Sequence, residues 1–293
     1  MRFDNSRESD NIEDRRGDGG GGGLPIGGRG IGLGTVVLAL VAMYFGVDPR
    51  VVLNLAEQAP APSAPAQHRA GPPANDPETV FVRHVLAETE DTWQTLFRQN
   101  GREYVDPKLV LFSGATRTAC GTGQTAMGPF YCPADQKVYI DLAFYQELKS
   151  RFHAPGEFAQ AYVIAHEVGH HVQNLLGISA KVQAARERAG ERESNALSVR
   201  LELQADCLAG VWAHTRYERG QDDPTKRLDD GDIDEALTAA EGVGDDTIQE
   251  NATGRVNPDA FTHGTSEQRA RWFKKGYDTG NSEECDSFSV DDL

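Results

Sequence analysis

The pattern of hydrophobic and charged positions divides the first quarter of the chain into three segments. Residues 1–30 mix charges of both signs, end in a glycine tract and show no apolar periodicity, so we expect a disordered tail. Residues 31–47 carry no charged side chain, and 17 such residues lie at the short end of the range for a transmembrane helix. Residues 48–75 are rich in Pro and Ala, which favours an extended, semi-rigid linker.

Charges around the apolar segment predict the orientation of the membrane span. Arg15, Arg16 and Arg29 precede residues 31–47, and Asp48 follows them directly. By the positive-inside rule the N-terminus is then cytoplasmic and the rest of the chain lies outside, as in a single-pass protein of the bacterial cell membrane. Two alternatives stay open, a buried core helix and a cleaved signal peptide.

Periodic patterns from residue 76 onward predict one folded domain, residues 76–293. Asp76-Pro77-Glu78 is typical of a helix start, and apolar residues at helical spacing follow it. The β-branched runs 109–112 and 137–142, separated by turn residues, predict a small antiparallel sheet. We therefore expect an α+β fold that is mainly α. Lys137–Asp141 is either an edge strand that holds an extended peptide or an ordinary strand of the sheet.

Composition narrows the class of protein. The chain has 45 Asp plus Glu against 29 Lys plus Arg, which gives a formal net charge of −16. A phosphate-binding surface needs clustered basic residues, and none occurs here, so we expect no nucleic-acid partner. A hydrophobic content of 39% is sufficient for a core. Composition does not predict the oligomeric state.

One predicted helix carries the motif H-E-x-x-H. His166 and His170 are four residues apart, so their side chains lie about 40° apart around the helix axis and one turn along it. Two imidazoles placed in this way can bind one zinc ion. Glu167 follows the first ligand directly and can act as the general base that accepts a proton from zinc-activated water. The alternative is two ordinary surface histidines.

A hydrolytic zinc site needs a third protein ligand and an open position for water. The next predicted helix, residues 194–217, carries Glu202 and Asp206, two acids one turn apart on an otherwise apolar helix. We assign Glu202 to the metal, one Zn²⁺ per chain, and Asp206 to a hydrogen bond that orients a ligand histidine. Exchanged roles and an ordinary solvated helix face stay open as alternatives.

Two further residues are candidates for supporting the reaction. Thr262-His263-Gly264 precedes a predicted helix start, and Arg269 lies in the first turns of that helix. His263 is a candidate donor to the developing charge on the attacked carbonyl oxygen, and Arg269 is a candidate for orienting the site or the substrate. A hydrogen-bonded structural histidine is the alternative for His263.

The chain has four cysteines. In an oxidising compartment the pairs Cys120–Cys132 and Cys207–Cys285 are the most economical of three possible connectivities. For Cys207 a zinc-bound thiolate is the alternative.

These motifs resemble those of the gluzincins, in which a Glu from a downstream E-x-x-x-D helix completes the zinc site. The chain is more closely similar to a family of bacterial membrane-anchored neutral zinc metallopeptidases. The resemblance covers nearly the whole length, apart from the glycine run near residue 20 and the linker, and implies a gluzincin-like fold, zinc and peptidase activity without a particular substrate. It rests on Arg7–Arg16, the predicted span, Gly128–Pro133, His166–Gln173, Glu202–Trp212 and Thr262–Arg269.

The expected function is that of a membrane-anchored zinc peptidase acting on a peptide or protein substrate. One alternative is a catalytically silent, zinc-stabilised scaffold that binds envelope proteins. Another is a zinc hydrolase with a non-peptide substrate, which would share the same residues.

Overall fold

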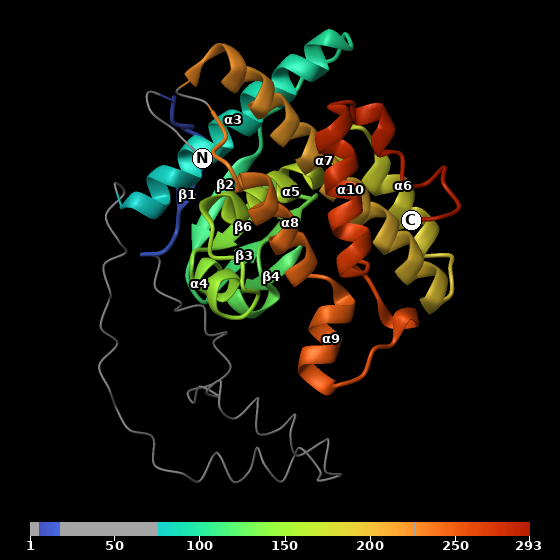
Figure 1. Ribbon diagram of the computed structural model, residues 1–293. Helices are drawn as coiled ribbons and strands as arrows, with labels where there is room; N and C mark the ends of the chain where they lie inside the picture. The colour runs from blue at the N-terminus through green and yellow to red at the C-terminus, as the bar shows by residue number, and fades with distance from the viewer. Residues whose placement is uncertain (1–5, 18–75, 225–226) are drawn as a thin grey trace, which may run out of the picture. The chain divides into compact units, whose positions relative to one another are not determined.

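The computed structural model describes residues 6–17, 76–224 and 227–293 of the 293-residue chain (Figure 1). The predicted span 31–47 and the linker 48–75 lie outside the described residues. Within the described ranges, no helix combines the length and the apolar character that a bilayer crossing requires. Apart from Gly17, the described residues belong to one compact unit.

Helix α3 (Pro77–Gln99) begins where the sequence predicts it. Asp76 is its N-cap and accepts a hydrogen bond from the backbone N–H of Thr79 at 3.0 Å. Pro77 occupies the first helical position, where the missing N–H costs no hydrogen bond. The buried face of α3 contacts α5 and α7.

The main sheet has four strands in the order β1–β2–β6–β5. Strands β2 and β6 pair in parallel, with Leu109 opposite Val138, so the prediction of an antiparallel sheet is wrong for these two runs. Parallel pairing needs a crossover of about a dozen residues or more, and residues 113–136 supply it. The strands are β1 (Ile12–Asp14), β2 (Lys108–Phe112), β5 (Phe130–Cys132) and β6 (Lys137–Asp141).

The crossover between β2 and β6 has structure of its own. Strands β3 (Ala115–Thr118) and β4 (Gly121–Gln124) form a separate antiparallel hairpin, followed by the short 3₁₀ helix η1 (Thr125–Met127) and by β5. Strand β5 then pairs antiparallel with β6, so the sheet is mixed. The described residues are nevertheless mainly helical, in agreement with the predicted α+β class.

Helix α5 lies between the sheet and the pair α7–α10 (Figure 1). It contacts β5 and β6 on one side and α7 and α8 on the other, which explains why most of its residues are buried. The elements after the sheet are α4 (Ala143–Ser150), α5 (Glu157–Leu175), α6 (Ile178–Arg186), α7 (Glu191–Asp222), α8 (Asp232–Gly242), α9 (Asp245–Thr253), η3 (Pro258–Ala260), α10 (Ser266–Thr279) and η4 (Ser282–Cys285).

A glycine and a disulfide bond determine how α5, α7 and the C-terminal region pack together. A Cβ atom at Gly169 of α5 would lie 3.0 Å from the carbonyl oxygen of Ala205 in α7, so glycine permits the close approach of these helices. The Cys207–Cys285 bond joins α7 to η4. The second bond, Cys120–Cys132, joins the hairpin to β5, and both predicted pairs are therefore present.

The expectation of a disordered tail does not hold for residues 6–17. Ile12–Asp14 forms strand β1, which pairs in parallel with β2. The charged residues of this segment bind partners on the domain, which the sequence pattern did not reveal because it contains no apolar periodicity. The contacts that order the segment are mainly polar, and Ile12 adds an apolar contact with the core.

Candidate metal centre

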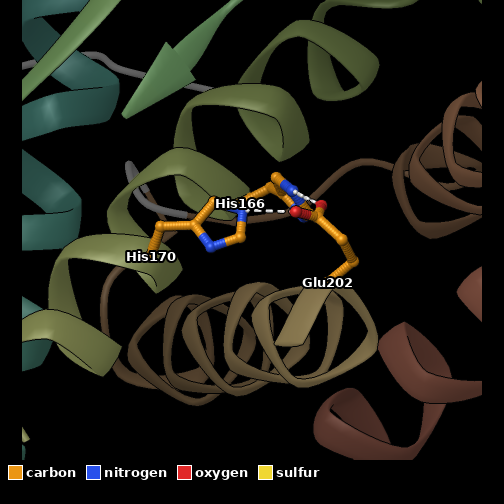
Figure 2. A group of neighbouring side chains, drawn as sticks. All are labelled: His166, His170 and Glu202. Carbon is orange, nitrogen blue, oxygen red and sulfur yellow. Dashed lines mark hydrogen bonds and ion pairs between the residues drawn. The ribbon is translucent and has the colours of Figure 1, made fainter. Parts of the chain in front are cut away.

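Three side chains from α5 and α7 converge on one point (Figure 2). His166 and His170 project from consecutive turns of α5, and Glu202 faces them from α7. One ligand atom from each residue lies within 4.8 Å of the others. Glu202 Oε2 is 3.2 Å from His166 Nε2, and Glu202 Oε1 is 3.4 Å from His170 Nε2.

These separations fit zinc. Ligand atoms about 2.0–2.2 Å from the ion at tetrahedral positions lie roughly 3.3–3.6 Å from one another. The nitrogen–oxygen distances of 3.2 Å to Glu202 Oε2 and 3.4 Å to Glu202 Oε1 lie close to this range, and the three ligand atoms lie within 4.8 Å of one another. Two imidazoles and one carboxylate also leave a fourth tetrahedral position, which distinguishes hydrolytic zinc sites from closed structural ones.

Asp206 lies directly behind His166, in the position predicted for it. Its Oδ1 accepts a hydrogen bond from His166 Nδ1 at 2.8 Å, which turns Nε2 towards the metal position. Arg269 binds the same carboxylate through Nε and Nη2, at 2.8 and 3.0 Å. The hydroxyl of Tyr162 donates to Asp206 Oδ1 at 2.5 Å. Glu202 reaches the Nε2 atoms of both histidines, whereas Asp206 binds His166 at Nδ1, so the geometry favours Glu202 as the ligand.

Electrostatic interactions keep the buried carboxylate of Asp206 ionised. Burial alone would raise the pKa of Asp206, but the guanidinium of Arg269 and the His166 ring hold it at about 2. For His166, burial alone would lower the pKa, and the charge and hydrogen bond of Asp206 raise it to about 10. His166 therefore carries a proton in the metal-free state, and zinc must displace that proton in order to bind.

Glu167 lies on the wall of a cavity of about 810 Å³ that also contains the three candidate ligands. The side chain is buried, and burial raises the pKa of its carboxyl group above the ordinary value, although His166 and His170 oppose this. A carboxylate of raised pKa is a better proton acceptor at neutral pH. Its position therefore suits the general base that the motif predicts.

His170 is oriented by a residue that the sequence reading did not single out. Gln173 Oε1 accepts from His170 Nδ1 at 2.8 Å, and Gln173 Nε2 donates to the backbone oxygen of Leu201 at 2.7 Å. Gln173 thus connects one ligand of α5 to the residue that precedes Glu202 on α7. The i, i+3 spacing from His170 on one helix was the available signal.

His263 reaches the cavity from the loop that precedes α10, and its side chain is half-exposed. Asp245 Oδ2 accepts from the backbone N–H groups of Thr262, His263 and Gly264, at 2.6, 2.6 and 3.1 Å. Asp245 Oδ1 lies 3.2 Å from His263 Nδ1. Burial alone would lower the pKa of His263, but Asp245 and Glu202 raise it, which favours a protonated ring.

Asp245 is a second residue that sequence reasoning missed. It lies 18 positions before His263 and belongs to the first turn of α9, where an acidic residue is expected for local reasons alone. No short-range pattern links the two residues. The predicted Arg269, in contrast, is buried against Asp206 and Tyr162, so it orients the ligand system through Asp206.

Two alternatives can be compared with the structure. Cys207 is bonded to Cys285, so it is not a zinc ligand. Strand β6 (Lys137–Asp141) lies between β2 and β5, so it is an interior strand and cannot accept an added peptide strand. The sheet ends at β5 on this side, and Phe130 and Tyr131 of β5 line the cavity.

Two histidines and a glutamate that could hold a metal ion lie on a mainly helical α+β domain, and this ligand set is one that hydrolytic zinc sites use. Comparison with known proteins agrees with this class. The chain belongs to the family described as "Putative neutral zinc metallopeptidase", whose model matches residues 1–288. This family implies zinc as the metal and hydrolysis as the reaction class.

Related proteins match the chain over most of its length. It is 50% identical over 295 residues to "Uncharacterized protein YpfJ" of Escherichia coli (strain K12), covering 98% of this chain and 99% of the relative. It is 42% identical over 265 residues to "Uncharacterized protein Rv2575" of Mycobacterium tuberculosis (strain ATCC 25618 / H37Rv), covering 86% of each. No solved structure matches the chain.

Proposed function

We propose that the protein is a zinc-dependent peptidase that hydrolyses peptide bonds in peptide or protein substrates, with Glu167 as general base. The observation that carries the proposal is the convergence of His166, His170 and Glu202 within 4.8 Å, beside Glu167 in one cavity. The edge strand β5 on the cavity wall supports a peptide substrate, because an extended chain can pair with such an edge.

The residues of this chain divide the chemistry between them. Zinc held by His166, His170 and Glu202 would polarise a carbonyl group as a Lewis acid and acidify water. Glu167 accepts the proton of the attacking water and delivers it to the leaving amine. His263, held by Asp245, donates a hydrogen bond from Nε2 to the carbonyl oxygen as negative charge develops there, and the raised pKa of its ring favours the form that can donate. Asp206 and Arg269 hold His166 in the ligating orientation.

Replacement of the general base tests this proposal. We expect Glu167→Gln in the full-length protein to retain one zinc per chain by elemental analysis. Cleavage of a library of internally quenched peptides should fall by about 10²–10⁴-fold. The matched control is Glu157→Gln, because Glu157 is an exposed residue on the same helix.

Two outcomes would count against this proposal, the first against the role of Glu167 and the second against a peptidase. Unchanged cleavage by Glu167→Gln would remove Glu167 from the mechanism. A zinc-loaded wild-type protein that cleaves none of the peptides, and whose biological phenotype survives Glu167→Gln, would favour the zinc-stabilised scaffold instead.

We also propose that the domain lies outside the cell membrane and is attached to it through residues 31–47. The two disulfide bonds support this location, since all four cysteines of the chain are paired and such bonds persist in oxidising compartments. The uncharged character of residues 31–47 supports the attachment.

A further inference from the structure

Residues 6–17, called here the N-terminal segment, are joined to the domain by backbone hydrogen bonds. Strand β1 within it pairs with β2, with Ile12 opposite Leu109 and Asp14 opposite Leu111. The N–H of Leu109 donates to the carbonyl of Asn11 at 2.8 Å, and the N–H of Arg15 donates to the carbonyl of Leu111 at 2.8 Å. The segment therefore covers an edge of the main sheet that would otherwise expose its ladder groups.

Side chains of the segment also complete a buried polar cluster. Glu90 of α3 is 2% exposed, and three side chains of the segment donate to its carboxylate. The donors are Arg7 Nη2 at 2.7 Å, Ser9 Oγ at 2.5 Å and Asn11 Nδ2 at 2.9 Å. A buried carboxylate without such donors lowers the stability of the fold. The domain and the segment therefore stabilise each other through Glu90.

The segment ends beside the point where the domain begins. Arg16 is almost fully buried, and its Nη2 lies 3.1 Å from Asp76 Oδ2 and 2.7 Å from Thr79 Oγ1. Asp76 is the N-cap of α3. Residues 16 and 76, which lie at the two ends of the intervening stretch of chain, are thus joined by a direct contact between their side chains.

The contact between Arg16 and Asp76 conflicts with a single crossing of the membrane between residues 17 and 76. The hydrocarbon core of a bilayer is about 30 Å thick, so a single crossing by residues 31–47 would place the N-terminal segment and the domain on opposite faces. Exchange of the segment between two copies would not resolve the conflict, because every copy would have the same orientation.

We propose that the N-terminal segment stays docked on the domain in the membrane-attached protein, so that both lie in the same compartment. This replaces the opposite-side arrangement that the positive-inside rule predicts. Attachment through residues 31–47 is compatible with it, provided that the chain enters and leaves the bilayer at one face. The proposal does not depend on catalytic activity.

Thiol labelling of the full-length protein in spheroplasts tests the compartment. Asp10→Cys places a thiol at an exposed position of the N-terminal segment, and Glu103→Cys places one at an exposed position of the domain. The native cysteines are paired, so the added thiol is the one that reacts. We expect a membrane-impermeant maleimide to label both variants to the same extent in intact spheroplasts and after lysis.

Each outcome of the labelling decides between the two arrangements. Labelling of Glu103→Cys in intact spheroplasts with labelling of Asp10→Cys only after lysis would overturn the proposal. Labelling of both only after lysis would uphold the shared compartment and refute the external location, while leaving the zinc chemistry untouched.

Zero-length crosslinking of the wild-type protein in the same membranes tests docking directly. Lys137 Nζ lies 2.7 Å from Glu13 Oε1, so carbodiimide should join these residues, and mass spectrometry should detect the peptide pair. The pair should vanish in Glu13→Gln. The reference is the Lys275–Glu284 pair, 3.9 Å apart within the domain. Absence of the first crosslink while the reference forms would refute docking.

Discussion

Two buried carboxylates in this protein have similar surroundings and different consequences. Asp206 is fully buried and is bound by Arg269, Tyr162 and His166. Glu90 is 2% exposed and is bound by an arginine, a serine and an asparagine of the N-terminal segment. Burial and hydrogen bonding are therefore alike at the two sites.

The two clusters differ in what the hydrogen-bond partners of the carboxylate contact next. The His166 ring that contacts Asp206 presents its other nitrogen 3.2 Å from Glu202, so the Asp206 cluster reaches the metal position. The partners of Glu90 belong to the N-terminal segment, and Arg7 among them also binds Asp91 of α3, which makes that cluster a docking contact. A buried ionic cluster is thus no evidence of catalysis until one of its members also faces a site.

The largest expected effect comes from removing the cation at Asp206. Arg269→Ala leaves a fully buried carboxylate without its guanidinium, so we expect the free energy of unfolding to fall by about 3–5 kcal/mol. Urea unfolding of the metal-free protein measures this change. A loss below about 1 kcal/mol would show that water or a rearrangement replaces Arg269.

The comparison predicts a clear difference in zinc affinity. Asp206→Asn weakens the hydrogen bond that orients His166, and such changes lower metal affinity by about 10–100-fold. Glu90→Gln is the matched change in the other cluster and should leave zinc affinity unaltered. Competition with a chromophoric chelator measures both constants, and equal losses would refute the distinction.

Acid should act on Asp206 in a defined range of pH. Its folded pKa of about 2 lies below the unfolded value of about 3.9, so its stabilising contribution is complete above that value and disappears as the pH falls towards 2. The gap in unfolding free energy between the wild type and Asp206→Asn, both metal-free, should shrink by roughly 2 kcal/mol between pH 5 and pH 2. A constant gap would contradict the assignment.

The smallest expected effect concerns the N-terminal segment. Arg7→Ala removes hydrogen bonds to Glu90 and Asp91 from a side chain that is 45% exposed, so we expect a loss of about 1 kcal/mol. Glu8→Ala is the control, since Glu8 is exposed and its ion pair with Arg83 is long, at 4.0 Å. Thermal unfolding should separate the two variants, with zinc content equal in both.

Local rules predicted the parts of the fold that depend on neighbouring residues. Spacing along a single helix predicted the N-cap at Asp76. It also predicted the shared face of His166 and His170 on α5, and the positions of Glu202 and Asp206 one turn apart on α7. The contact of Asp206 with a ligand histidine was also predictable, because a zinc-bound imidazole needs an acceptor for its second nitrogen.

Contacts that join distant segments could not be predicted in this way. The parallel pairing of β2 with β6 depends on the path of residues 113–136, which two apolar runs do not specify. Asp245 holds the His263 loop across 18 positions without a shared local pattern. The order of the N-terminal segment depends on polar partners on α3, and polar contacts of this kind leave no apolar periodicity in the sequence.

The absence of a side chain at Gly169 has a consequence for the position of Glu202. An alanine methyl group there would meet the Ala205 carbonyl at 3.0 Å and push α7 outward by a few tenths of an ångström. Glu202 belongs to that helix, so such a shift would also move its carboxylate away from His166 and His170. A hydrogen atom in place of a methyl group on α5 thus sets how closely the third candidate ligand approaches the first two.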